Sequence, residues 1–143
     1  MDTTQLINVN LIDRPENPMR LQFDEEDIQA LCASIGEQGI LVPLLVRRKG
    51  DRYEVIDGDS RLEAAHRLRI GEVLCVVRDA TDSETHILRM QSNLERSDPD
   101  PVSEAVYIAA AITAGHITAE EFSQKLNRST QWIDDRLSIA VMP

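Results

Sequence analysis

The first half of the chain alternates between the apolar spacing of strands and that of helices. Residues 5–12 predict one half-buried strand. Residues 24–38 then carry apolar side chains at helical spacing. Asp24 is the expected cap of this helix, and Gly39 is the expected stop. A strand followed by an amphipathic helix therefore opens the predicted fold.

Two apolar runs rich in β-forming residues follow, at residues 41–48 and 52–56. The turn between them, residues 49–51, predicts a hairpin. A helix over residues 61–69 and a strand over residues 72–77 continue the pattern. Thr81 and Glu84 have the spacing of a capping box that opens another helix.

A segment with two prolines, residues 97–101, interrupts this pattern and predicts a boundary. Everything beyond it has helical spacing, over residues 103–114, 118–126 and 129–140. The predicted fold class is therefore α/β (α+β), with two domains. An N-terminal domain covers residues 1–97, and a small all-α unit covers residues 98–143.

Composition and charge narrow the functional classes. Apolar residues make up 42% of the 143 positions and charged residues 28%, as in globular proteins. The longest apolar run, residues 40–46, is too short to span a bilayer, and we expect no membrane association and no signal peptide. Two lone cysteines fit a reducing cytoplasm, and three unpaired histidines predict no zinc site. A net charge of −10 argues against non-specific binding of nucleic acid.

The junction at Gly58, between a strand and a helix, is a candidate phosphate site. Glycine lets backbone N–H groups approach a ligand, and a helix N-terminus attracts anions. Arg61 in the first turn adds a bidentate donor. Asp57 and Asp59 oppose an anion here unless a cation bridges them. The alternative is an ordinary tight turn in which Asp59 or Ser60 caps the helix.

A second polar cluster, at Asn93 and Arg96, ends the helix before the proline segment. Asn93 can hold a hydrated Mg²⁺ ion and Arg96 can hold a phosphate. The alternative is a solvated helix end, where an arginine favours the helix dipole.

Residues 118–140 have the spacing of a helix-turn-helix. Ser123 is small enough for a close helix crossing, Asn127 can adopt the left-handed turn, and Ile133 is a β-branched anchor. The alternative is a plain three-helix packing unit. From residue 102 onward the chain has three bases against five acids, which weakens the case for duplex binding. The candidate DNA contacts are Arg128, Ser129, Thr130, Gln131, Trp132 and Arg136.

Taken in order, these segments resemble the ParB family of DNA-partition proteins. The matching segments are residues 20–38 for its opening helix, 39–46, 57–65 and 92–96 for its three boxes, and the helix-turn-helix after the linker. The resemblance implies a nucleotide-gated clamp that serves plasmid, phage or chromosome partition or transcription regulation. It implies a specific double-stranded DNA site, a homodimer formed through nucleotide-dependent contacts of the N-terminal domain, a partition ATPase as partner, and a cytoplasmic, nucleoid-associated location.

The resemblance also implies site residues. The nucleotide, CTP, would contact Gly58, Asp59, Ser60, Arg61 and Arg96. Mg²⁺ would be held by Asn93, and no catalytic residue is assigned.

This chain departs from the family pattern at three positions. In the second box, Ser60 replaces the first arginine and the acid is the shorter Asp59. In the third box, Ser92 replaces the glutamate that the family uses in hydrolysis. We therefore expect CTP to be bound weakly or not at all, and hydrolysed near background. The family continues beyond the position of Pro143 with further DNA-binding helices and a dimerisation segment, so we also expect the helical unit to be truncated.

The N-terminal fold also resembles sulfiredoxin and certain small-molecule kinases. Sulfiredoxin chemistry is discounted, because it needs a cysteine in the second box, where this chain has Asp59 and Ser60. A small-molecule kinase could use Asp57 or Asp59 as base, although a helix-turn-helix has no evident use in it. A nucleotide-free protein-interaction regulator is the third class, and Ser60 and Ser92 favour it.

Overall fold

The computed structural model describes residues 2–19, 23–96 and 100–141, which pack into two compact units. The first unit runs to Glu16 and from residue 23 to Asp79. The second unit consists of two segments, residues 17–19 and the described residues from Ala80 onward. The mixed α and β class predicted from the sequence is confirmed.

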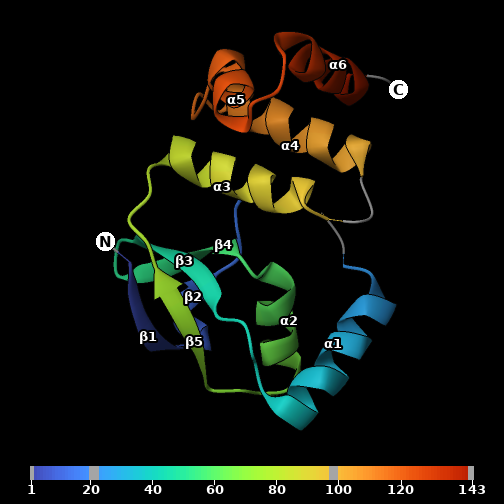
Figure 1. Cartoon of the computed structure of the whole chain (residues 1–143). Coiled ribbons are helices and arrows are strands. Elements are labelled where there is room, and N and C mark those ends of the chain that lie inside the picture. Colours follow the sequence, from blue (N-terminus) through green and yellow to red (C-terminus); the bar gives the residue numbers. More distant parts are fainter. Residues whose placement is uncertain (1, 20–22, 97–99, 142–143) are drawn as a thin grey trace. The chain divides into compact units, whose positions relative to one another are not determined.

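The first unit is a five-stranded sheet with two helices (Figure 1). Its elements are β1 (Thr3–Asn8), a 3₁₀ turn (Val9–Leu11), β2 (Ile12–Asp13), α1 (Glu25–Gln38), β3 (Leu44–Lys49), β4 (Arg52–Asp57), α2 (Asp59–Arg67) and β5 (Glu72–Val77). The strand order is β1-β5-β3-β4-β2. The pair β1–β5 and the hairpin β3–β4 are antiparallel, whereas β3–β5 and β2–β4 are parallel.

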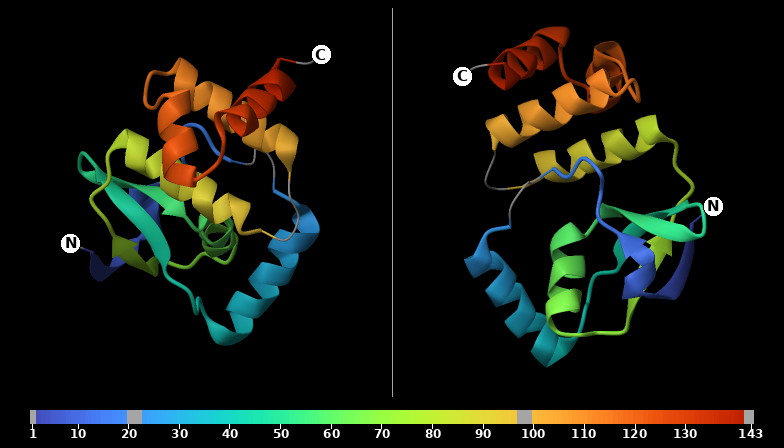
Figure 2. Two further views of the ribbon diagram at one scale, coloured as in Figure 1. Left: turned by 45° about the horizontal axis from the view of Figure 1, so that its top comes forward. Right: turned by 180° about the vertical axis from the view of Figure 1, so that it is seen from behind.

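Helix α2 lies between the sheet and α1 in each view of Figures 1 and 2. Leu44 and Val46 of β3 alternate inward and are fully buried, as period-two spacing requires. Leu62 and Ala65 of α2 complete the same core. This packing holds the start of α2 at the end of β4, where the candidate phosphate site lies.

The second unit consists of four helices: α3 (Asp82–Leu94), α4 (Pro101–Thr113), α5 (Ala119–Leu126) and α6 (Thr130–Ala140). Met90 of α3, Tyr107 of α4, Phe122 of α5 and Ile133 of α6 meet in one buried core. No helix among residues 2–19, 23–96 and 100–141 has the length and apolar run to cross a membrane.

Several local predictions are confirmed. Asp24 caps α1, and Gly39 ends it with a φ of 76°. Thr81 and Glu84 form the expected capping box. Asn127 adopts the left-handed conformation, with a φ of 54°. The start of the resemblance at residues 20–22 and the linker residues 97–99 lie outside the described residues.

Other local predictions are wrong. The single strand over residues 5–12 is broken, because the Asn8 side chain accepts a hydrogen bond from Asn10 N and caps a 3₁₀ turn. The helix expected from residue 61 begins at Asp59, and Gly58, not Asp59 or Ser60, is its cap residue.

Helix α3 packs with the other helices of the second unit. Ile87 and Met90 join the helical core, so packing divides the chain after Asp79. The domain boundary predicted between residues 97 and 98 rests on prolines. Prolines indicate a loop, but they do not indicate which core the preceding helix joins. As a boundary between domains it stays a prediction.

Candidate functional site

Gly58 shapes the junction between β4 and α2. Its φ of 111° lies in the left-handed region, which side chains disfavour. A Cβ atom at this position would lie 2.9 Å from Arg61 Nη2 and 3.0 Å from Leu44 Cγ. Glycine is therefore required both by the backbone conformation and by the space that Arg61 and Leu44 occupy.

Arg61 turns its guanidinium back toward this glycine. Its Nε atom is buried and has no hydrogen-bond partner among the described residues. A buried donor without an acceptor costs about 1–3 kcal/mol, so a bound anion would be stabilised there. The α2 N-terminus adds backbone N–H groups, since Gly58 offers no side-chain cap.

Asp59 does not leave an uncompensated negative charge at this helix start. Its carboxylate accepts from Arg14 Nε at 2.8 Å and from Arg14 Nη2 at 2.7 Å. The same contact raises the pKa of Arg14. The Arg14 guanidinium also stacks on the Phe23 ring, 4.5 Å from its centroid. Ser60 follows in the first turn of α2 and is half-buried.

Asn93 and Arg96 lie in the second unit, at the end of α3. The Asn93 side chain donates through Nδ2 to Glu104 Oε2 at 3.0 Å. The backbone N–H of Arg96 donates to Asn93 O, and the Arg96 side chain is exposed. The predicted nucleotide residues are thus brought together as two groups, one in each unit.

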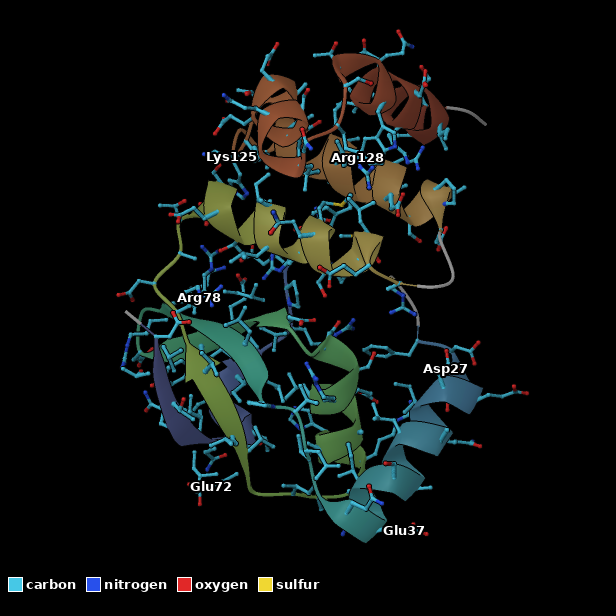
Figure 3. The ribbon with its side chains drawn as sticks, viewed as in Figure 1. Asp27, Glu37, Glu72, Arg78, Lys125 and Arg128 are labelled. Atoms are coloured by element: carbon cyan, nitrogen blue, oxygen red, sulfur yellow. The ribbon has the colours of Figure 1, made fainter. Side chains whose placement is uncertain are left out.

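All the candidate DNA-binding residues except Arg136 lie at the turn between α5 and α6 or in the first turn of α6, near Lys125 and Arg128 in Figure 3. Ser129 caps α6 by accepting from Trp132 N at 3.0 Å. Ser123 Oγ donates to Arg128 O at 2.6 Å, which ties α5 to the turn. Thr130 is exposed on the first turn of α6.

Other members of this group have partners inside the unit. Gln131 Nε2 donates to Asp135 Oδ1 at 2.8 Å. Arg136 donates through Nε to the buried Glu104 at 3.1 Å, and its side chain is 19% exposed. Its guanidinium lies 4.4 Å from the Trp132 ring centroid, and that of Arg128 lies 5.6 Å away. Arg136 is therefore engaged within the helical unit.

Arg14 and Glu104 were missed in the sequence. Neither belongs to a motif, and their partners are 11 to 45 positions distant. The sequence did offer one hint for Arg14. Asp57 and Asp59 flank Gly58, and they would repel an anion there unless a cation compensates them.

Two observations bear on metal and thiol chemistry. No cluster of three or more histidine, cysteine or acidic side chains in the described residues could hold a metal ion. Burial raises the pKa of the Cys75 thiol to about 11, so the thiolate is scarce at neutral pH. An Mg²⁺ ion would therefore depend on single oxygens, such as Asn93 Oδ1, together with ligand phosphates.

Comparison with protein families gives a match to the ParB N-terminal domain over residues 1–94. The chromosome-partitioning protein ParB of Myxococcus xanthus is 32% identical over 135 residues, which cover 94% of this chain and 46% of the relative. The chromosome-partitioning protein Spo0J of Thermus thermophilus is 38% identical over 129 residues, covering 90% and 47%. The chain spans about half the length of these curated relatives.

Among solved structures, the C-terminally truncated ParB of Caulobacter crescentus, crystallised with CTP-gamma-S, is 26% identical. Its TM-score is 0.61, and the match covers 99% of this chain and 80% of the other. The similarity extends across both units.

Proposed function

Because this chain belongs to the ParB family, we propose that it acts in DNA partition, binding a specific duplex site under the control of CTP and Mg²⁺. The observation that carries the nucleotide part is Arg61, whose buried Nε without an acceptor lies beside Gly58. The Caulobacter relative was crystallised with a CTP analogue, which supports a cytidine nucleotide as the ligand.

The first unit would bind phosphate groups at the start of α2. Gly58 leaves the space that the Arg61 guanidinium occupies, and Arg61 donates to a phosphate oxygen. The backbone N–H groups at the start of α2 also donate to the phosphate. Arg14 compensates Asp59, so the acid that follows Gly58 does not repel the ligand. Ser60 can donate only one hydroxyl where the family has an arginine, and this predicts a modest affinity.

The second unit would supply Asn93 Oδ1 to the metal and Arg96 to a phosphate. Mg²⁺, when bound, neutralises phosphate charge. Ser92 provides no carboxylate to activate water, so we expect the bound nucleotide to persist with hydrolysis near background. Such a protein would hold a nucleotide-dependent state for long periods instead of cycling rapidly.

For DNA, we propose that α5 and α6 form a helix-turn-helix. The left-handed Asn127, the Ser129 cap and the buried Ile133 anchor support this geometry. The exposed start of α6 and the two residues before it would face the duplex. These residues are Arg128, Ser129, Thr130 and Gln131, and Trp132 would pack beside them. Since Arg136 is held by Glu104, we propose that it orients α6 from inside the unit.

The remaining predictions on assembly and place are a homodimer closed by nucleotide-dependent contacts, a partition ATPase as partner and a location on the nucleoid. All three follow from the family resemblance. They are proposals, since the chain spans about half the length of these relatives.

The nucleotide proposal is tested by titrating the chain with CTP, ATP, GTP and UTP, each with and without Mg²⁺. We expect CTP with Mg²⁺ to bind more tightly than the other three. Binding of none of them would favour the nucleotide-free regulator, and transfer of the γ-phosphoryl group from ATP to a small hydroxyl compound would favour the kinase.

The DNA proposal is tested by selecting duplexes from a random library and measuring their affinity by fluorescence anisotropy. Thr130→Ala should weaken binding to the selected site, by about 1 kcal/mol for one lost hydrogen bond. Ser138→Ala, at an exposed position farther along α6, is the matched control. Equal losses in both variants, or no selected sequence, would contradict the proposal.

A further inference from the structure

Glu104 on α4 is a nearly fully buried carboxylate, with 2% of its surface exposed. Each of its oxygens has a different partner from a different helix. Oε2 accepts from Asn93 Nδ2 of α3 at 3.0 Å, and Oε1 accepts from Arg136 Nε of α6 at 3.1 Å. Buried charges are costly unless paired in this way, so all three side chains are tied together.

The contact with Glu104 determines which way the Asn93 amide points. An ionised carboxylate can only accept hydrogen bonds, so the NH₂ group of Asn93 must face it. The carbonyl oxygen, Oδ1, then points to the other side. That oxygen is the atom a hard divalent cation would use.

The other oxygen of Glu104 acts on α6. Arg136 is held between Glu104 and the face of Trp132, 4.4 Å from the ring centroid. Trp132 lies in the first turns of α6, directly after the exposed Thr130 and Gln131. The orientation of this helix start therefore depends on the same carboxylate that orients Asn93.

We propose that Glu104 is a positioning residue that holds Asn93 with its carbonyl oxygen free for a divalent cation and links it to Arg136 on α6. The inference rests on the proposed function, since it assigns the metal to Asn93 Oδ1 and DNA to α6. A change at Arg136 is then felt at Asn93 through a chain of two hydrogen bonds, within one unit.

The substitution Glu104→Gln separates the two tasks of the carboxylate. A glutamine has one accepting oxygen and one donating nitrogen. If the oxygen stays with Arg136, its NH₂ group faces Asn93, whose carbonyl must turn inward to accept. The metal ligand is then lost while the helix packing is kept.

The first measurement is the affinity for CTP with and without Mg²⁺, by calorimetric titration. We expect Mg²⁺ to improve the affinity of the wild type for CTP. Most of this improvement should be lost in Glu104→Gln, because residues that orient a metal ligand contribute about 10–100-fold to metal affinity. The affinity without Mg²⁺ should be unchanged. Glu95→Gln, an equal charge change at the exposed end of α3, is the control and should keep the full Mg²⁺ effect. A full Mg²⁺ effect in Glu104→Gln would overturn the inference.

The second measurement needs no nucleotide and tests the link from Arg136 through Glu104 to Asn93 even if CTP does not bind or Glu104→Gln does not fold. It follows the side-chain NH₂ resonances of Asn93 by ¹⁵N-resolved NMR, assigned from their absence in Asn93→Ser. In Arg136→Gln we expect them to shift, because the charge that polarises Glu104 is removed. Resonances unchanged by Arg136→Gln would overturn the inference. Absence of CTP binding by the wild type would overturn the proposed nucleotide function alone.

Discussion

The guanidinium of Arg14 holds the carboxylate of Asp59 in a two-pronged ion pair, with N–O distances of 2.8 and 2.7 Å across 45 positions of sequence. Asp59 opens α2, where a bare carboxylate would compete with a phosphate for the helix N-terminus. Arg14 thus makes the acid beside Gly58 compatible with an anionic ligand.

We predict that Arg14→Gln weakens CTP binding by about 1 kcal/mol, roughly fivefold, because Asp59 regains an uncompensated charge. Stability should fall by less than this, since the pair is partly exposed. The double variant with Asp59→Asn should recover the lost affinity. Calorimetric titration checks both, and a double variant as weak as Arg14→Gln would show that charge compensation is not the cause.

Gly58→Ala tests the shape of the junction. A residue with a Cβ atom in this conformation is strained by about 1–3 kcal/mol, and the new atom would also displace Arg61. We expect lower stability and weaker CTP binding, measured by urea unfolding and titration. Gly36 is the matched control, because it lies inside α1 with nothing within 4 Å of its Cβ position. Gly36→Ala should stabilise the chain by about 0.5–1 kcal/mol, and a loss of stability there equal to that of Gly58→Ala would refute the argument.

Ser92→Glu tests why turnover is expected to be slow. A carboxylate next to Asn93 can act as a general base, which contributes about 10²–10⁴-fold in rate. We expect phosphate release from CTP to rise in this variant, with Mg²⁺ and DNA present, and not in Ser92→Gln. Rapid turnover by the unmodified chain would show that another acid serves as base.

The helical unit should lose stability in acid through its capping boxes. Hydrogen bonds from Thr118 N–H and Ser83 Oγ lower the pKa of Glu121, and Thr81 does the same for Glu84. A lowered pKa stabilises the fold above the ordinary glutamate pKa, about 4.3, and this stabilisation disappears as pH falls below it. Glutamine also forms capping boxes, so the double variant Glu84→Gln with Glu121→Gln should show a smaller fall of Tm between pH 7 and pH 3. An identical fall would place the acid-sensitive groups elsewhere.

The sequence predicted best those features whose partners are close in the chain. The Thr81 capping box, the left-handed Asn127 and the Ser129 cap all depend on contacts within a few residues, and all are present. The broken first strand was missed because a side chain, Asn8, competes locally with the ladder.

The candidate site was predicted only in part for a related reason. Gly58 and Arg61 were identified from a local turn motif, whereas Arg14 and Glu104 act on groups brought to them by the tertiary fold. Long-range ion pairs have no periodicity, and one chain without relatives gives no signal for them. The packing of α3 into the helical core was also not predicted, because it depends on apolar contacts with residues that are distant in the sequence.

The central claim is that Arg61, at the start of α2, is the cation that binds the triphosphate. Calorimetric titration of CTP with Mg²⁺ into the wild type, Arg61→Ala and Arg67→Ala tests it most directly. Arg67 lies on the same helix, pairs with Glu25 and Glu63, and controls for the loss of one charge from α2. We expect Arg61→Ala to weaken binding by about 1.5–3 kcal/mol, the loss of a charge-assisted hydrogen bond, and Arg67→Ala to leave it unchanged. An affinity of Arg61→Ala equal to that of the wild type would contradict the account.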